Sequence, residues 1–213
     1  MIMRREKPQY EGQVFDLQGR LKLINHPVRP AIPVAVAALG PKNVAMTAEL
    51  ADGWLPTLYS PAKAAEVFGP ALAEGRSRRA ADLAPLEVVA PAAVAITDDP
   101  SAARDRARVG MALYIGGMGS RKQNFYNQLF RRYGYEAEAS EIQELYLTGK
   151  QPEAIGKVTD EMVDEVSILG PAGYVKDRLA QFAEAGVSTL LVQVADPDPS
   201  NMIRTLERLA ELA

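Results

Sequence analysis

Residues 39–43 (Leu-Gly-Pro-Lys-Asn) combine the features of an anion-binding turn. Gly40 has no Cβ, so a ligand can lie close to the backbone there. Pro41 suits the first turn of a helix, where its missing N–H would have no partner in any case. Lys42 and Asn43 would then stand beside unpaired backbone N–H groups, which attract anions and phosphate above all. From the residues alone, an ordinary strand-to-helix turn explains the segment slightly better.

Other chemistry is restricted by what the composition lacks. The chain has no cysteine, which excludes disulfides, thiolate nucleophiles and Cys-ligated metals. Its single histidine, His26, excludes His-rich metal sites and makes a Ser-His-Asp triad improbable. We therefore expect no metal site, and the sequence identifies no catalytic acid, base or nucleophile.

The elements that position this turn alternate between strand and helix. Apolar runs predict four parallel strands, and amphipathic patterns with Ser, Asp, Pro and Gly boundary signals predict helices between them. Short connections of this kind are typical of a parallel sheet with helical crossovers, either an open doubly wound sheet or a β/α barrel. No G-x-G-x-x-G fingerprint follows any strand. The predicted strands are 33–38, 54–59, 87–96 and 188–194, and the predicted helices are 41–51, 61–75, 100–114, 171–185 and 199–212.

Two segments interrupt the alternation. Residues 10–23 indicate a long loop or a small hairpin. Residues 116–157 are too long for one crossover and are glycine-rich at first, then helical in pattern. We interpret them as a helical insertion that covers the sheet or forms a subunit contact. A lid over a ligand pocket, hinged at Gly116, Gly117 and Gly119, is the alternative.

Charge and hydropathy narrow the class of protein. The formal net charge is −3 over 213 residues, so no overall basic field favours nucleic acid or an anionic membrane. Arginine clusters such as Arg131 and Arg132 are interpreted as solvated helix faces. No stretch reaches the roughly 18 apolar residues of a membrane span, and the first residues lack the apolar region of a signal peptide. We expect one cytoplasmic domain covering residues 1–213.

Three stretches resemble the luciferase-like family, and within it the coenzyme F420-dependent oxidoreductases related to methylenetetrahydromethanopterin reductase. They are RREKPQYEG (4–12), VAALGPKNVAMTAELADGWLP (36–56) and VDEVSILGPAGYVKDRLAQFAEAGVSTLLVQV (163–194). The resemblance implies an eight-stranded β/α barrel of the TIM type. It also implies a soluble oxidoreductase that moves a hydride between the deazaflavin and a small organic substrate.

The resemblance also assigns residues. In the family, the loop after strand five binds the phosphate-bearing tail of the cofactor through backbone amides. The end of strand six lies in the substrate pocket of some relatives. Ser60 stands where phosphate-substrate relatives have a lysine, which argues against a sugar phosphate. Carried over, the cofactor role falls on Ala38, Leu39, Gly40, Lys42 and Asn43, and the substrate role on Trp54 and Thr57.

The start of the chain departs from the family pattern. Residues 1–12 match the end of the fourth helix and the following loop, which implies a barrel limited to its C-terminal half with a helical insertion before the last strand. An open half-barrel exposes two sheet edges, so we expect a homodimer or larger assembly. Two other functions stay open: an FMN-dependent monooxygenase, and a non-catalytic half-barrel that binds a phosphorylated ligand.

Overall fold

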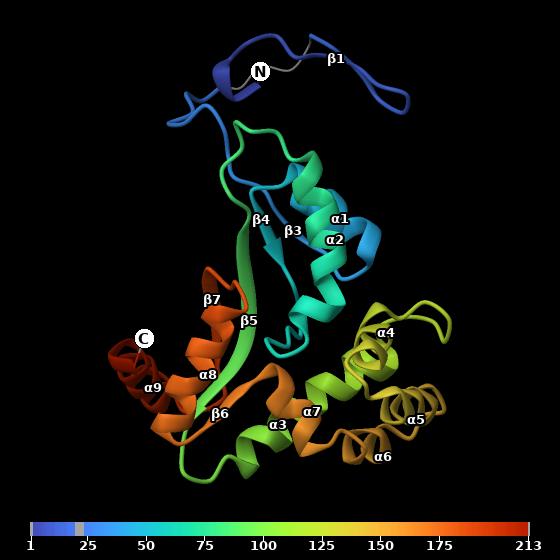
Figure 1. Ribbon diagram of the computed structural model, residues 1–213, viewed down its shortest axis with the longest axis vertical. Helices are drawn as coiled ribbons and strands as arrows, with labels where there is room; N and C mark the ends of the chain where they lie inside the picture. Colours follow the sequence, from blue (N-terminus) through green and yellow to red (C-terminus); the bar gives the residue numbers. More distant parts are fainter. Residues whose placement is uncertain (1, 20–23, 213) are drawn as a thin grey trace. The chain divides into compact units, whose positions relative to one another are not determined.

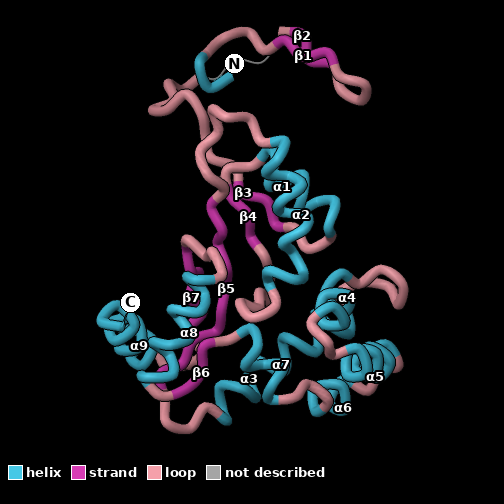
Figure 2. Tube along the Cα trace, viewed as in Figure 1, coloured by secondary structure: helices cyan, strands magenta, loops and turns pink. Residues whose placement is uncertain are grey.

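The computed structural model describes residues 2–19 and 24–212. Its contacts divide the chain into a small N-terminal unit, Met1–Val34, and a main unit, Ala35–Ala213. The N-terminal unit holds a short 3-10 helix (Ile2–Arg4) and an antiparallel hairpin of β1 (Gln9–Glu11) and β2 (Asp16–Gln18), drawn in magenta in Figure 2. Of the two alternatives predicted for residues 10–23, a long loop and a small hairpin, the structure has the hairpin. Residues 20–23 lie outside the described residues.

The main unit is built on a five-stranded sheet in which every pairing is parallel, as the alternation of strand and helix predicts. The order is β3-β4-β5-β6, and β7 pairs with the other side of β5. The described residues thus form an open parallel sheet of the β/α-barrel type, not a closed barrel (Figure 1). The strands are β3 (Ala35–Ala37), β4 (Gly53–Leu55), β5 (Glu87–Ile96), β6 (Ile168–Gly170) and β7 (Thr189–Val194).

Two strand predictions need correction. The predicted strand 54–59 ends at Leu55, because Pro56 has no N–H to donate to the ladder. The three-residue strand β6 was not predicted, and its brevity explains why no apolar run marks it. The helical insertion consequently lies before β6 and not directly before the last strand.

The helices follow the predicted order, with corrected ends. Gly75 does not end α2, which continues to Arg78, whereas Gly186, with φ of +90°, does stop α8. A five-residue π-helical turn, Leu113–Gly117, follows α3. The helices are α1 (Pro41–Leu50), α2 (Ala64–Arg78), α3 (Ser101–Ala112), α4 (Phe125–Arg132), α5 (Glu136–Leu147), α6 (Gln151–Gly156), α7 (Asp160–Val166), α8 (Ala172–Glu184) and α9 (Pro199–Leu212).

The core lies on one face of the sheet. Alternate residues of β5 are buried there, namely Val88, Ala90, Ala92 and Val94. Helices α1 and α2 cover β3 and β4 with an aromatic cluster in which the Trp54 ring meets Phe68 edge-on at 5.0 Å between centroids. The opposite face is partly open, since β7 alternates between exposed and half-buried residues. This packing fixes the C-terminal ends of β3 and β4, from which the predicted anion loop emerges.

Candidate functional site

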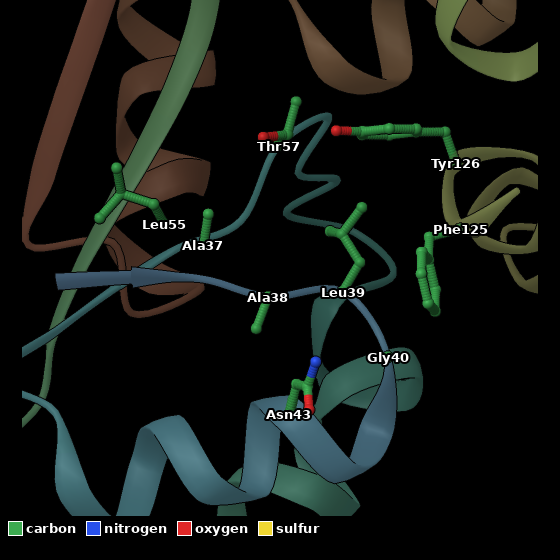
Figure 3. Close-up of a pocket in the computed structure, with 9 residues that line it drawn as sticks. All are labelled: Ala37, Ala38, Leu39, Gly40, Asn43, Leu55, Thr57, Phe125 and Tyr126. Carbon is green, nitrogen blue, oxygen red and sulfur yellow. The ribbon is translucent and has the colours of Figure 1, made fainter. Parts of the chain in front are cut away.

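A cavity of about 190 Å³ lies at the C-terminal ends of β3 and β4. We call it the loop cavity. Three segments far apart in the sequence form it: the end of β3 with its following loop, the end of β4, and the start of α4 (Figure 3). Its lining residues are Ala37, Ala38, Leu39, Gly40, Asn43, Leu55, Thr57, Phe125 and Tyr126.

The N-terminus of α1 meets this cavity without a side-chain cap. Gly40 is the N-cap residue, with φ of −75° and ψ of 142°, and no side chain bonds to the first-turn amides. Such amides are free to bind an anion. The backbone angles of Gly40 are ones that any residue can adopt, so they do not require a glycine. A Cβ at this position would lie 3.5 Å from Cε1 of Phe125, so the glycine keeps space open beside that ring.

The predicted residues do not all reach the cavity. Ala38, Leu39, Gly40, Asn43 and Thr57 line it. The exposed Lys42 side chain is not part of the lining.

Trp54 lies in the core and does not line the cavity, so its predicted contact with a substrate stays a prediction. Its side chain is only 1% exposed, and its indole N–H donates to the carbonyl of Ala38 over 2.9 Å. Trp54 therefore holds the end of β3 in place from behind.

The insertion supplies a wall that the sequence analysis missed. Phe125 and Tyr126 open α4, and Figure 3 shows the Tyr126 ring directed toward Thr57 across the cavity. Asn124 caps this helix by accepting hydrogen bonds from the amides of Tyr126 at 2.9 Å and Asn127 at 3.0 Å. An asparagine ahead of a helical pattern is an N-cap signal that could have located the start of this wall.

Two of the three glycines considered as lid hinges are packed. A Cβ on Gly116 would lie 2.5 Å from the Cβ of Tyr146, and one on Gly117 would lie 2.5 Å from its Cε1. Both glycines let the π-helical turn approach α5 closely. Gly119 has φ of +150°, an angle that favours glycine at the turn itself.

A cation also lies beside the loop. Arg132 was interpreted as part of a solvated helix face, yet it is half-buried and its Nη2 donates to the carbonyl of Leu39 over 3.0 Å. Its guanidinium stands 5.6 Å from the centroid of the Phe68 ring, and burial lowers its pKa from the usual value. Arginine is always charged in proteins, so this residue adds positive potential next to the loop.

The turn that carries Thr57 is fixed by the insertion. Leu58 has φ of +56°, which is strained for a leucine. The Tyr133 hydroxyl donates to the carbonyl of Leu58 over 3.0 Å and accepts from the amide of Ser60 at 3.2 Å. Burial raises the pKa of Tyr133, so the hydroxyl keeps its proton and remains a donor. The side chain of Ser60 donates in turn to Glu165.

Tyr133→Phe should lower the free energy of unfolding by about 1–3 kcal/mol, because it leaves the buried amide of Ser60 and the partly buried carbonyl of Leu58 without this partner. Tyr135→Phe is the matched control. Its hydroxyl makes one 3.3 Å bond, to Glu165, from a half-buried position, so its loss should cost less. Urea unfolding of both variants checks this. Equal losses of stability in the two variants would show that the Tyr133 hydroxyl does not hold the turn.

The described residues offer no metal site and no membrane span. Across residues 2–19 and 24–212, no three His, Cys, Asp or Glu side chains gather closely enough to hold a metal ion. Within the same ranges, no helix has the length and apolar character needed to cross a bilayer.

The chain belongs to the luciferase-like monooxygenase family, whose model matches residues 1–189. It is 41% identical over 174 residues to a Mycobacterium tuberculosis protein named as a candidate coenzyme F420-dependent oxidoreductase, covering 81% of this chain and 50% of that protein. It is 29% identical over 207 residues to 5,10-methylenetetrahydromethanopterin reductase of Archaeoglobus fulgidus, covering 92% and 58%. The resemblance to F420-dependent oxidoreductases is thereby confirmed.

Solved structures agree on the fold. The coenzyme F420-dependent tetrahydromethanopterin reductase of Methanopyrus kandleri superposes with a TM-score of 0.76 at 24% identity, covering 96% of this chain and 57% of that one. An F420-dependent secondary alcohol dehydrogenase, solved with an F420–acetone adduct, gives a TM-score of 0.70 at 18% identity, covering 100% and 58%. The chain thus spans a little over half the length of these two relatives.

Proposed function

We propose that this chain takes part in hydride transfer between coenzyme F420 and a small organic substrate, with the loop cavity holding the phosphate-bearing tail of the cofactor. One observation carries the proposal. An uncapped helix N-terminus opens onto a cavity lined by the small residues Ala37, Ala38 and Gly40. The relationship to proteins named as F420-dependent supports the choice of cofactor.

Each residue of the site has a distinct part in this proposal. The amides at Leu39, Gly40, Lys42 and Asn43 bind the phosphate, and Asn43 adds a side-chain amide. Lys42 attracts the anion from outside the cavity, where its effect is weakened by salt. When bound, the deazaflavin supplies the hydride chemistry, and the protein supplies placement and electrostatics. Thr57 marks the side of the cavity from which a substrate would approach.

Gly40→Val should weaken coenzyme F420 binding at least about tenfold, because the added methyl groups enter the space beside Phe125. The backbone angles of Gly40 suit valine, so the fold should persist. Fluorescence titration of the whole chain with coenzyme F420 and with FMN measures the effect.

Gly173→Val is the control, since a Cβ at Gly173 meets nothing within 4 Å. Equal F420 affinity in wild type and Gly40→Val would take the loop out of the site. Tight FMN binding without F420 binding would assign the chain to the FMN-dependent monooxygenases. Binding of inorganic phosphate alone would favour the non-catalytic alternative.

Assembly and location stay predictions. In the described sheet, β3 pairs only with β4, and β7 pairs only with β5, so both edges are available to a second copy. We predict a homo-oligomer from these two open sheet edges. We predict a cytoplasmic location from the composition.

A further inference from the structure

A second cavity, of about 280 Å³, adjoins the first. We call it the strand-gap cavity. The two share Thr57, and Tyr114 of the second packs edge-on against Tyr126 of the first, with 4.7 Å between ring centroids. Thr57 on one side and the tyrosine pair on the other therefore mark where the two cavities meet.

The strand-gap cavity lies beside the part of β5 that has no strand paired with it on one side. Strand β4 pairs with β5 only at Glu87 and Val88, and β6 pairs with it only from Val94 onward. On that side, residues 89–93 have no strand opposite them among the described residues. Pro91 and Ala93 of this stretch line the cavity.

The direction of the backbone groups in this gap follows from the ladder. Val88 and Val94 accept hydrogen bonds on the β7 side, from the amides of Ser188 at 3.0 Å and Ala195 at 2.9 Å. The amide of Glu87 donates to the opposite side. Because neighbouring residues of a strand alternate in direction, the Pro91 carbonyl and the Ala93 N–H face the gap. A backbone acceptor and a backbone donor thus point into a space lined by both apolar and polar residues.

The lining carries little charge. It contains no lysine, aspartate, glutamate or histidine. Its one charged residue, Arg106, is exposed, and its guanidinium donates to the carbonyl of Ala195. Because Arg106 is exposed, water and salt weaken its attraction for an anion, so the cost of burying an anion in this cavity would be poorly offset.

We propose that the strand-gap cavity binds a small uncharged molecule with an apolar body and one carbonyl or hydroxyl group, held by the Ala93 N–H, the Pro91 carbonyl and the Thr57 hydroxyl. This inference rests on the proposed function, because it takes the bound molecule to be the organic substrate of the proposed hydride transfer. The volume lies below the roughly 300–1,000 Å³ of pockets for drug-sized ligands, which favours a small molecule. The shared Thr57 places the bound molecule next to the loop cavity.

Four ring compounds that differ in one group test the charge preference: cyclohexanone, cyclohexanol, cyclohexanecarboxylate and cyclohexyl phosphate. Amide chemical-shift titration of the whole chain, without cofactor, measures each affinity. The two neutral compounds should bind at least about tenfold more tightly than the two anions and should shift the Ala93 amide. Anions that bind as tightly as the neutral compounds would overturn the proposal.

Ala93→Leu tests the location, because its larger side chain fills the cavity. Cyclohexanone affinity should fall at least about tenfold, while inorganic phosphate affinity at the loop cavity stays unchanged. Unchanged cyclohexanone affinity in Ala93→Leu would also overturn the proposal. A separate F420 titration distinguishes the two proposals: cyclohexanone binding at Ala93 without F420 binding would reject the proposed function alone.

Discussion

Gly75→Val should lower the free energy of unfolding by about 3 kcal/mol or more, the largest stability effect we expect in this chain. A Cβ at Gly75 would lie 2.1 Å from the carbonyl oxygen of Ala45 and 2.7 Å from the Cβ of Ala48. Both belong to α1, so the two helices would have to separate. Because α1 begins at the predicted anion loop, cofactor affinity should fall with stability.

Urea unfolding of Gly75→Val and Gly173→Val gives the comparison. Gly173 is exposed near the start of α8 with open space around it, so valine there should change the free energy of unfolding by less than about 1 kcal/mol. If Gly75→Val were as stable as Gly173→Val, the close approach of α1 and α2 would not be a feature of the protein in solution.

Asn124→Ala should cost about 2–4 kcal/mol and should also weaken cofactor binding. The buried side chain does two things at once. Its oxygen caps α4, and its nitrogen donates to the carbonyls of Tyr114 at 2.9 Å and Ile115 at 3.0 Å. Losing it frees the helix start that carries Phe125 and Tyr126. Unfolding and F420 titration measure the two effects.

Asn124→Asp separates the two roles of this side chain. Aspartate keeps the cap oxygen for the α4 amides but cannot donate to the two carbonyls, so it isolates the link to the π-helical turn. We expect a stability loss here also, since a carboxylate would face two carbonyl oxygens. Wild-type stability and wild-type F420 affinity in Asn124→Ala would show that α4 needs no such anchor.

The sequence predicts much of the fold because the relevant signals are local. Apolar runs and cap residues lie within a few positions of the elements they define, so the parallel strands and most helices could be located. Strand β6 was not predicted because three residues are too few to show the alternating pattern of a strand. Gly75 looked like a helix end, yet its role is close packing against a helix that is adjacent only in the folded chain.

The candidate site was predictable only in part, for the same reason. The loop around Gly40 carries its own signals of glycine, proline and a helix start. Phe125, Tyr126 and Arg132 reach it only through the tertiary fold of the insertion, about 90 residues later in the chain. Trp54 is the opposite case: it is close to the site in the sequence, yet its side chain packs in the core.

Hydrogen exchange of the backbone amides, with and without coenzyme F420, tests the central claim most directly. The amide of Val44 already donates to the carbonyl of Gly40 at 2.9 Å and serves as an internal reference. We predict slower exchange at Leu39, Gly40, Lys42 and Asn43 when the cofactor is added, and protection of the same four amides by excess inorganic phosphate alone. Binding of F420 with unchanged exchange at these four amides would contradict the assignment of the loop cavity to the cofactor.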